Sequence, residues 1–133
     1  MRTMFRRKGM DPKARRVALQ IGGTRVAIGV GALLATRPAL RALGFGEPEA
    51  TGLALAKLAG GRDIAIGALT LAARDDVEGL RTLLLVSSAC DVADAVGLGL
   101  SVRHPETRRA GIGGIASGSA AALAGLWAYR RLG

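Results

Sequence analysis

The sequence predicts an all-helical integral membrane protein whose four apolar helices form a bundle. Half of the 133 residues are hydrophobic, only 3% are aromatic, and glycine occurs 20 times. Small residues let helix backbones approach closely in a membrane, whereas soluble cores depend more on aromatic side chains. The chain also contains four apolar runs, each with about the 20 residues needed to cross a hydrocarbon core. Its net charge of +9 comes largely from basic residues that flank these runs.

We divide the chain into a basic cytoplasmic tail and one domain of four transmembrane helices. Residues 1–16 form the tail, and the helices are expected at about 17–35, 52–73, 79–100 and 110–129. The tail and the first run have the layout of a secretory signal, but the run contains an arginine and no cleavage site follows it. We therefore expect no cleavage.

The distribution of basic residues predicts that both termini are cytoplasmic, by the positive-inside rule. On the side of the termini, the expected segments hold Arg2, Arg6, Arg7, Lys8, Lys13, Arg15, Arg16, Arg74, Arg81, Arg130 and Arg131. The loops on the other side hold fewer: Arg37, Arg41, Arg103, Arg108 and Arg109. Such flanking clusters are typical of membrane topology, so we expect a lipid bilayer as partner and no nucleic acid.

The first helix contains one charge, Arg25, and a stripe of small residues at every fourth position. The stripe comprises Gly23, Ala27, Gly31 and Ala35, which predicts a packing face. After this helix, Pro38 suits the first turn of a short helix and Gly44 suits its end. We expect a short amphipathic segment lying in the membrane interface.

The second helix carries Lys57, Arg62 and Asp63. Its segment Gly60–Gly67 resembles Gly22–Gly29 of the first helix. Because these helices run in opposite directions, a true duplication would be an inverted repeat, as in many transporters. A chance match among glycine, alanine and isoleucine is the favoured explanation.

The third helix carries Asp91 and Asp94, and the fourth contains no internal charge. Small residues at every fourth position of the fourth helix, Gly114, Gly118 and Ala122, predict a helix-packing stripe. We expect this stripe to mediate self-association or contact with a membrane-protein partner. Trp127 and Tyr129 are typical of an interfacial anchor.

Six charges inside the expected helices sum to zero, and we interpret them as an intramembrane charge network. They are Arg25, Lys57, Arg62, Asp63, Asp91 and Asp94. One central charge costs about 2.5–3.5 kcal/mol to insert, so partners are needed. Depths estimated at about 1.5 Å per residue predict three pairs. These are Arg25 with Asp63, Arg62 with Asp91, and Lys57 with Asp94.

Other patterns in the chain are explained without a chemical role. Residues 111–116 match a relaxed dinucleotide-binding pattern but lack the preceding strand, so their glycines are assigned to helix packing. Cys90 is expected to be a small buried side chain, and His104 a solvated loop residue. We recognise no nucleophile with its base, no phosphate loop and no metal-ligand spacing. The sequence therefore predicts no enzyme activity, catalytic residue, metal or cofactor.

Arg25, the Pro38–Gly44 segment, Gly61-Arg62-Asp63 and the pair Asp91 and Asp94 together resemble a known family. It is a domain-of-unknown-function family of small, four-helix bacterial integral membrane proteins. The likeness covers about Val17 to Ser101. It implies four spans and a location in the inner (plasma) membrane, and it brings no established activity.

Two functions follow as hypotheses. The leading one is a non-enzymatic scaffold or accessory subunit whose charge network fixes helix order and register. The alternative is a transporter-like protein in which Asp63, Asp91 or Asp94 binds or relays a proton or cation, since intramembrane ionisable residues are functional candidates. A soluble bundle is disfavoured by the apolar fourth helix. A membrane enzyme would need a cavity that joins His104 to the charges.

Overall fold

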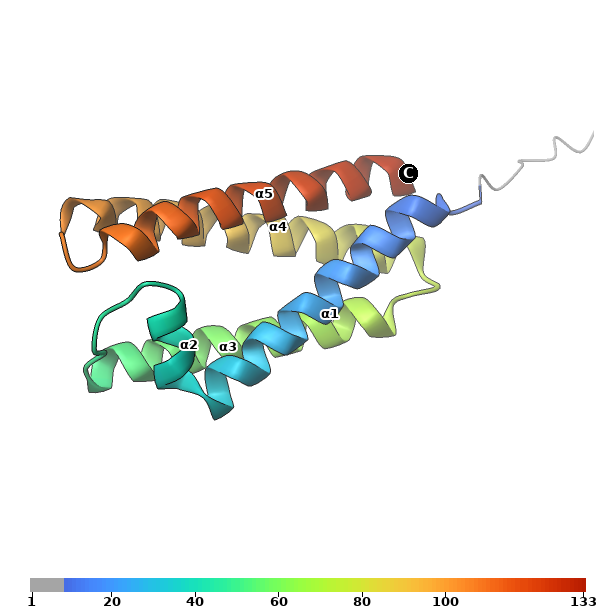
Figure 1. The fold of residues 1–133 in the computed structure, drawn as a ribbon. Coiled ribbons are helices and arrows are strands. Elements are labelled where there is room, and N and C mark those ends of the chain that lie inside the picture. Colours follow the sequence, from blue (N-terminus) through green and yellow to red (C-terminus); the bar gives the residue numbers. More distant parts are fainter. Residues whose placement is uncertain (1–8) are drawn as a thin grey trace, which may run out of the picture.

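The computed structural model describes residues 9–133, which fold into five α-helices and one short 3-10 helix. The helices are α1 (Pro12–Leu34), α2 (Thr36–Ala42), α3 (Ala50–Ala72), α4 (Val77–Leu100), η1 (Ser101–Arg103) and α5 (Arg108–Leu132). The described part of the chain contains no strand, so the predicted all-helical class is confirmed. Helices α3, α4 and α5 run along one axis, α1 crosses them obliquely, and α2 lies at the end away from the C-terminus (Figure 1).

Helix α1 begins at Pro12, inside the segment that the sequence assigned to the tail. The carboxylate of Asp11 accepts hydrogen bonds from the backbone N–H groups of Lys13 at 2.8 Å and Ala14 at 3.3 Å. Pro12 takes the first helical position, where a missing N–H costs nothing. This cap extends the helix beyond its apolar run. Residues 1–8 of the predicted tail lie outside the described residues.

Helix α2 is the short helix that the sequence predicted around Pro38. Its chain reverses at Gly44, whose φ of 89° lies in the left-handed region that favours glycine. The N–H of Gly44 donates to the carbonyl of Arg41 and the N–H of Phe45 to that of Leu40, both at 3.0 Å. These two bonds form a Schellman motif, which ends the helix by satisfying its last carbonyl groups.

Glycines bring α1 and α3 into backbone contact. A Cβ atom on Gly29 would lie 2.5 Å from the carbonyl oxygen of Gly60, and one on Gly67 would lie 2.5 Å from that of Gly22. Any larger side chain at these positions would push the two helices apart. The α1–α3 pair therefore depends on the absence of side chains at its crossing.

The contacts in this pair follow a two-fold pattern of the kind that an inverted repeat would produce. Gly29 meets Gly60 and Ile64, while Gly67 meets Gly22 and Val26. Val26 and Ile64 occupy equivalent positions in the two similar segments. The segments thus pack against each other in opposite directions, with equivalent residues making equivalent contacts.

Helices α4 and α5 form a second close pair through glycines of α5. A Cβ on Gly118 would lie 2.9 Å from the carbonyl oxygen of Asp91, and one on Gly111 would lie 2.7 Å from that of Leu98. Gly114 lies against the side chain of Leu98, and Gly125 against that of Ser88. The predicted stripe of the fourth helix therefore packs within the chain.

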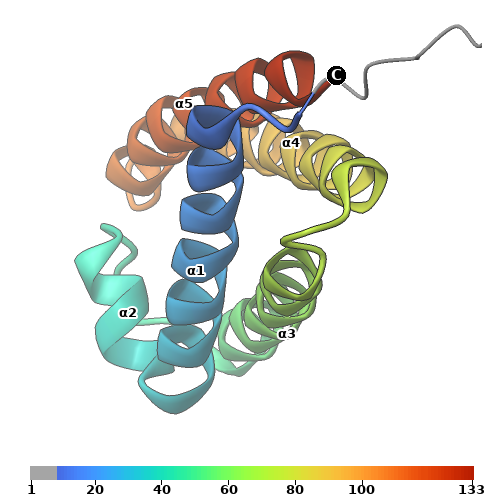
Figure 2. The same ribbon diagram turned by 90° about the vertical axis from the view of Figure 1, so that its right-hand side faces the viewer.

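The two pairs meet in an apolar cluster at the end of the bundle that holds the C-terminus (Figures 1 and 2). Its buried members come from α1, α4 and α5: Ala14, Ala18, Leu80, Leu84, Ala128 and Leu132. Apart from this cluster, few apolar side chains are buried. Many large ones face outward, among them Leu34, Leu58 and Leu123, which are 84%, 71% and 68% exposed.

Among the described residues, three helical segments are long and apolar enough to cross a membrane: α1, the continuous α4–η1 segment and α5. Together with the outward-facing apolar side chains, they indicate a multi-pass membrane protein. Helix α3 is not among the three. It has 23 residues, as α1 does, but carries Lys57, Arg62 and Asp63.

The glycine crossing can be tested with Gly67→Ala. The added methyl group would overlap the carbonyl of Gly22, so we expect a loss of about 1–3 kcal/mol, the usual cost of overpacking. The melting temperature in detergent should fall.

Gly61→Ala on the same helix is the matched control, because nothing lies within 4 Å of its added Cβ. It should melt at or above the wild-type temperature, since alanine favours helix by up to about 1 kcal/mol. Equal melting of the two variants would contradict the crossing.

Candidate functional site

The guanidinium group of Arg25, on α1, joins three helices. Its Nη1 donates to Oδ1 of Asp63 on α3 at 2.6 Å. Its Nε donates to Oγ of Ser87 at 2.6 Å, and its Nη2 donates to the carbonyl of Ser87 at 3.0 Å and to Oδ1 of Asp91, all on α4. One buried arginine thus holds α1 to both α3 and α4.

The chain of charges continues from Asp63 through its neighbour Arg62. Oδ1 of Asp63 also accepts from Nε and Nη2 of Arg62, at 3.3 and 3.2 Å. Arg62 then forms a two-pronged ion pair with Asp94 on α4, with Nη2 to Oδ2 at 2.7 Å and Nη1 to Oδ1 at 3.1 Å. The sequence of contacts is Asp91, Arg25, Asp63, Arg62, Asp94, so the signs alternate along it. We call these five residues the charge chain. It starts and ends on α4, one turn apart.

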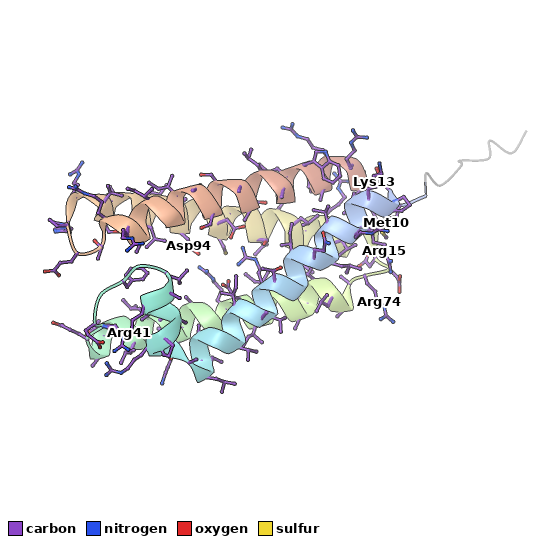
Figure 3. The ribbon with its side chains drawn as sticks, in the orientation of Figure 1. Met10, Lys13, Arg15, Arg41, Arg74 and Asp94 are labelled. Carbon is purple, nitrogen blue, oxygen red and sulfur yellow. The ribbon has the colours of Figure 1, made fainter. Side chains whose placement is uncertain are left out.

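Burial decreases along the charge chain. The side chain of Arg25 is 8% exposed, and those of Asp91 and Asp63 are 13% and 14% exposed. The side chains of Arg62 and Asp94 are 33% and 44% exposed. Asp94 lies on the side of α4 that faces the α1–α3 pair (Figure 3). The charge chain therefore has a buried inner end, formed by Asp91 and Arg25, and a more exposed outer end at Asp94.

Opposite charges in a low-dielectric interior attract strongly, but each has lost its hydration. Removing one partner leaves the other buried and unpaired, which is more costly than the pair itself. Two arginines and three aspartates give the charge chain a formal charge of −1 when all are ionised. Arg25 reduces the repulsion between Asp63 and Asp91 by binding both carboxylates, which lie on two different helices. The arrangement can hold three helices in fixed register, and its excess negative charge could attract a proton or cation.

The structure agrees with one of the three pairs predicted from depth. Arg25 pairs with Asp63 as predicted, and it also pairs with Asp91. The other two predicted pairs are wrong, because Arg62 binds Asp94 instead of Asp91. Lys57 is exposed and takes no part in an ion pair among the described residues. Depth alone does not specify which helix face a residue occupies, and a long arginine side chain reaches beyond its own level.

Ser87 is the site residue that sequence reasoning did not identify as a partner. Its hydroxyl and its carbonyl both accept from Arg25. The available signal was its position one turn before Asp91, on the same face of α4. Its neighbour Ser88 donates to the carbonyl of Ala122 at 3.3 Å and thereby ties α4 to α5.

The stripe Gly114, Gly118 and Ala122 lies against α4 within the same chain. The packing role predicted for it is therefore served intramolecularly. Self-association through α5 stays a prediction, and it would use the neighbouring face, where Gly113 and Ser117 are exposed.

The remaining candidate residues lie apart from the charge chain or at its edge. Cys90 is half-buried on α4, one turn before Asp94, and His104 is exposed between η1 and α5. No three His, Cys, Asp or Glu side chains of residues 9–133 come together in a way that could hold a metal ion.

Basic side chains gather at both ends of the bundle. Lys13, Arg15 and Arg74 lie at the end that holds the C-terminus, and Arg41 lies at the other end (Figure 3). Arg15 links α1 to the α3–α4 turn, with Nη2 at 3.0 Å from Oδ1 of Asp75. This ion pair is largely exposed and provides a useful contrast to the buried one at Arg25.

Comparison with known proteins gives one match. A family described as "Domain of unknown function (DUF4267)" matches residues 22–129, which include every member of the charge chain. No curated protein and no solved structure matches the chain. The match agrees with the resemblance drawn from the sequence.

The buried end of the charge chain can be tested with Arg25→Gln. This change leaves Asp63 and Asp91 without their main partner, and breaking a buried pair from one side costs about 3–5 kcal/mol. We expect little protein in the membrane and a lower melting temperature in detergent.

Adding Asp91→Asn should restore part of the loss, because the unpaired charge is removed. Arg15→Gln breaks an exposed pair worth about 0–1 kcal/mol and should change neither quantity. Wild-type behaviour of Arg25→Gln would contradict the clamp.

Proposed function

The chain belongs to the DUF4267 family of domains of unknown function, and from that premise we propose that it is a small membrane scaffold or accessory subunit. The proposal rests on the charge chain. Its most buried member, Arg25, uses all three guanidinium nitrogens to bind α3 and α4. A group so fully engaged serves to hold helices together, and we assign it no catalytic role, cofactor or metal.

We propose four membrane spans, with α3 as the second. Helices α1 and α4 are both candidate spans, and the α3–α4 turn lies at the end where α1 begins (Figure 1). The chain must therefore return across the bilayer between them, and α3 has the length to do so. Its three charges would cost about 8–10 kcal/mol to insert alone. Pairing of Arg62 and Asp63 with α1 and α4 explains how that cost is offset.

An even number of spans would put both termini on one side. The greater number of basic residues at this end supports a cytoplasmic location for it. We therefore place the protein in the inner (plasma) membrane of a bacterial cell, with lipid as its main surroundings. A second copy or another membrane protein would bind its exposed helix faces.

A transporter-like protein is the second candidate, and the outer end of the charge chain favours it. Asp94 is 44% exposed, and the five members carry a formal charge of −1. A proton or small cation that reached Asp94 would neutralise this excess. Arg25 would then separate the outer end from the apolar cluster at the termini.

Flux measurements decide between the two functions. Purified protein would be reconstituted in liposomes and exposed to a proton gradient or a sodium gradient. For a scaffold we expect leakage equal to that of protein-free liposomes. Flux that exceeds this level and disappears in Asp94→Asn, without a change in melting temperature, would favour transport. Asp75→Asn, in the exposed α3–α4 turn, is the matched control and should leave any flux unchanged.

The four-span topology is tested by reporter fusions after Glu47, Asp75, His104 and Gly133. Four spans with cytoplasmic termini predict cytoplasmic reporter activity at Asp75 and Gly133, and activity outside the cytoplasm at Glu47 and His104. A topology in which α3 does not cross would put Glu47 and Asp75 on the same side.

A further inference from the structure

The molecule consists of two closely packed helix pairs. The contacts that join one pair to the other are extensive in some places and sparse in others. Backbone contacts at glycines hold α1 to α3 and α4 to α5. By contrast, α3 packs much less extensively on α4 than on α1. In the end view, α3 and α4 are successive members of the ring of helices, joined by their turn (Figure 2). Relative motion of the two pairs would therefore separate α3 from α4.

Three contacts limit where such motion can occur. The apolar cluster, with Leu80 and Leu84 at its centre, fixes the pairs together at the end that holds the C-terminus. At the opposite end, the loop after α2 meets the start of α5, where a Cβ on Gly44 would lie 3.1 Å from Cβ of Arg109. Midway, Arg25 binds both α3 and α4. The one corner left free of these contacts is the half of α3 and α4 that is distant from their turn.

This corner is closed by an ion pair and by little else. We name it the seam and define it as residues 54–63 of α3 with residues 90–100 of α4. No residue of α4 beyond Ser88 is buried, and a Cβ on Gly97, three residues after Asp94, would have nothing within 4 Å. Arg62 and Asp94 bridge the seam, and both are partly exposed.

We propose that the seam is a gate, hinged at the apolar terminal cluster and latched by the Arg62–Asp94 ion pair, while Arg25 stays bound as the permanent clamp. The proposal does not depend on whether the protein is a scaffold or a transporter. It assigns different tasks to the two ends of one charge chain. Opening would expose Asp91 and Asp63 between α3 and α4, toward the end of the bundle at which α2 and η1 lie (Figure 1).

The difference in burial gives the physical reason. Arg25 and its acceptors are almost fully buried, so separating them would leave unpaired charges in a low-dielectric interior. Arg62 and Asp94 are partly exposed, and contact with water or headgroups weakens their attraction and stabilises them when apart. Arginine can also extend toward the interface while its stem remains among apolar groups. The outer pair can therefore open at small cost while the inner contacts persist.

The native cysteine provides the first test, because Cys90 lies within the seam and is the only cysteine in the chain. The full-length protein in liposomes would be labelled with a membrane-permeant maleimide. In Arg62→Gln and Asp94→Asn we expect labelling of Cys90 to accelerate by up to about fivefold. An exposed ion pair is worth up to about 1 kcal/mol, and 1.4 kcal/mol corresponds to tenfold. Melting temperatures should stay close to that of the wild type.

The matched control is Arg15→Gln, which removes an exposed ion pair at the hinged end and should leave the labelling rate unchanged. Wild-type labelling rates in both seam variants would overturn the gate. So would acceleration together with a large fall in melting temperature, because the pair would then be part of the structural clamp. Arg62→Lys keeps the charge but loses the two-pronged geometry, and its labelling rate should lie between those of wild type and Arg62→Gln.

Distances between spin labels test the hinge directly in a Cys90→Ser background. One label pair spans the seam, at Leu58→Cys and Val96→Cys, and the other lies near the turn, at Leu71→Cys and Thr82→Cys. On adding Arg62→Gln, we expect longer and broader distances for the first pair and no change for the second. A change in both pairs would indicate general loosening, and a change in neither would indicate a rigid seam. Either result would overturn the proposal.

Discussion

The guanidinium group of Arg25 is the contact on which the rest of the bundle depends. It is buried in the middle of α1 and binds an aspartate of α3 together with a serine and an aspartate of α4. Helix α3 carries too many charges to be stable alone in a hydrocarbon environment. Its position between α1 and α4 supplies partners for Arg62 and Asp63. The polar centre therefore explains why an apolar bundle contains a charged helix at all.

Glycine residues determine how closely the two helices of each pair can approach. Carbonyl groups occupy the space in which side chains would lie at Gly29, Gly67 and Gly118, so helix axes approach within each pair. Close approach brings Arg25 within reach of α3 and α4 at once. It also removes the need for aromatic residues in the interior, consistent with their rarity in the chain. Large apolar side chains instead face outward, as is typical of a membrane protein.

The charge chain joins a structural clamp to a more accessible group. At Arg25 the ion pairs are buried and fix the order of three helices, which supports the scaffold hypothesis. At Asp94 the same chain reaches the surface, which keeps a binding or transport role open as the second hypothesis. This gradient of burial follows from the fold, since α3 packs much less extensively on α4 than on α1. The structural role therefore belongs to the Arg25 end of the charge chain, and the binding or transport hypothesis belongs to its Asp94 end.

The sequence by itself determined the number of long helices, their approximate positions and part of their packing. Apolar runs located the four long helices, Pro38 and Gly44 located α2, and the small-residue stripe of the fourth helix located its packing face. The packing face predicted for the first helix from Gly23, Ala27, Gly31 and Ala35 is wrong. A Cβ on Gly23 or Gly31 would have nothing within 4 Å, and the contact with α3 is made by Gly22 and Gly29. Depth along a helix follows directly from residue number, and it identified the pair Arg25–Asp63. Only the tertiary structure decided that Arg62 binds Asp94, that Lys57 stays outside the network and that Ser87 joins it. Those outcomes depend on rotation and lateral placement of helices, which arise from glycine contacts between segments distant in sequence and are not encoded in spacing along one helix.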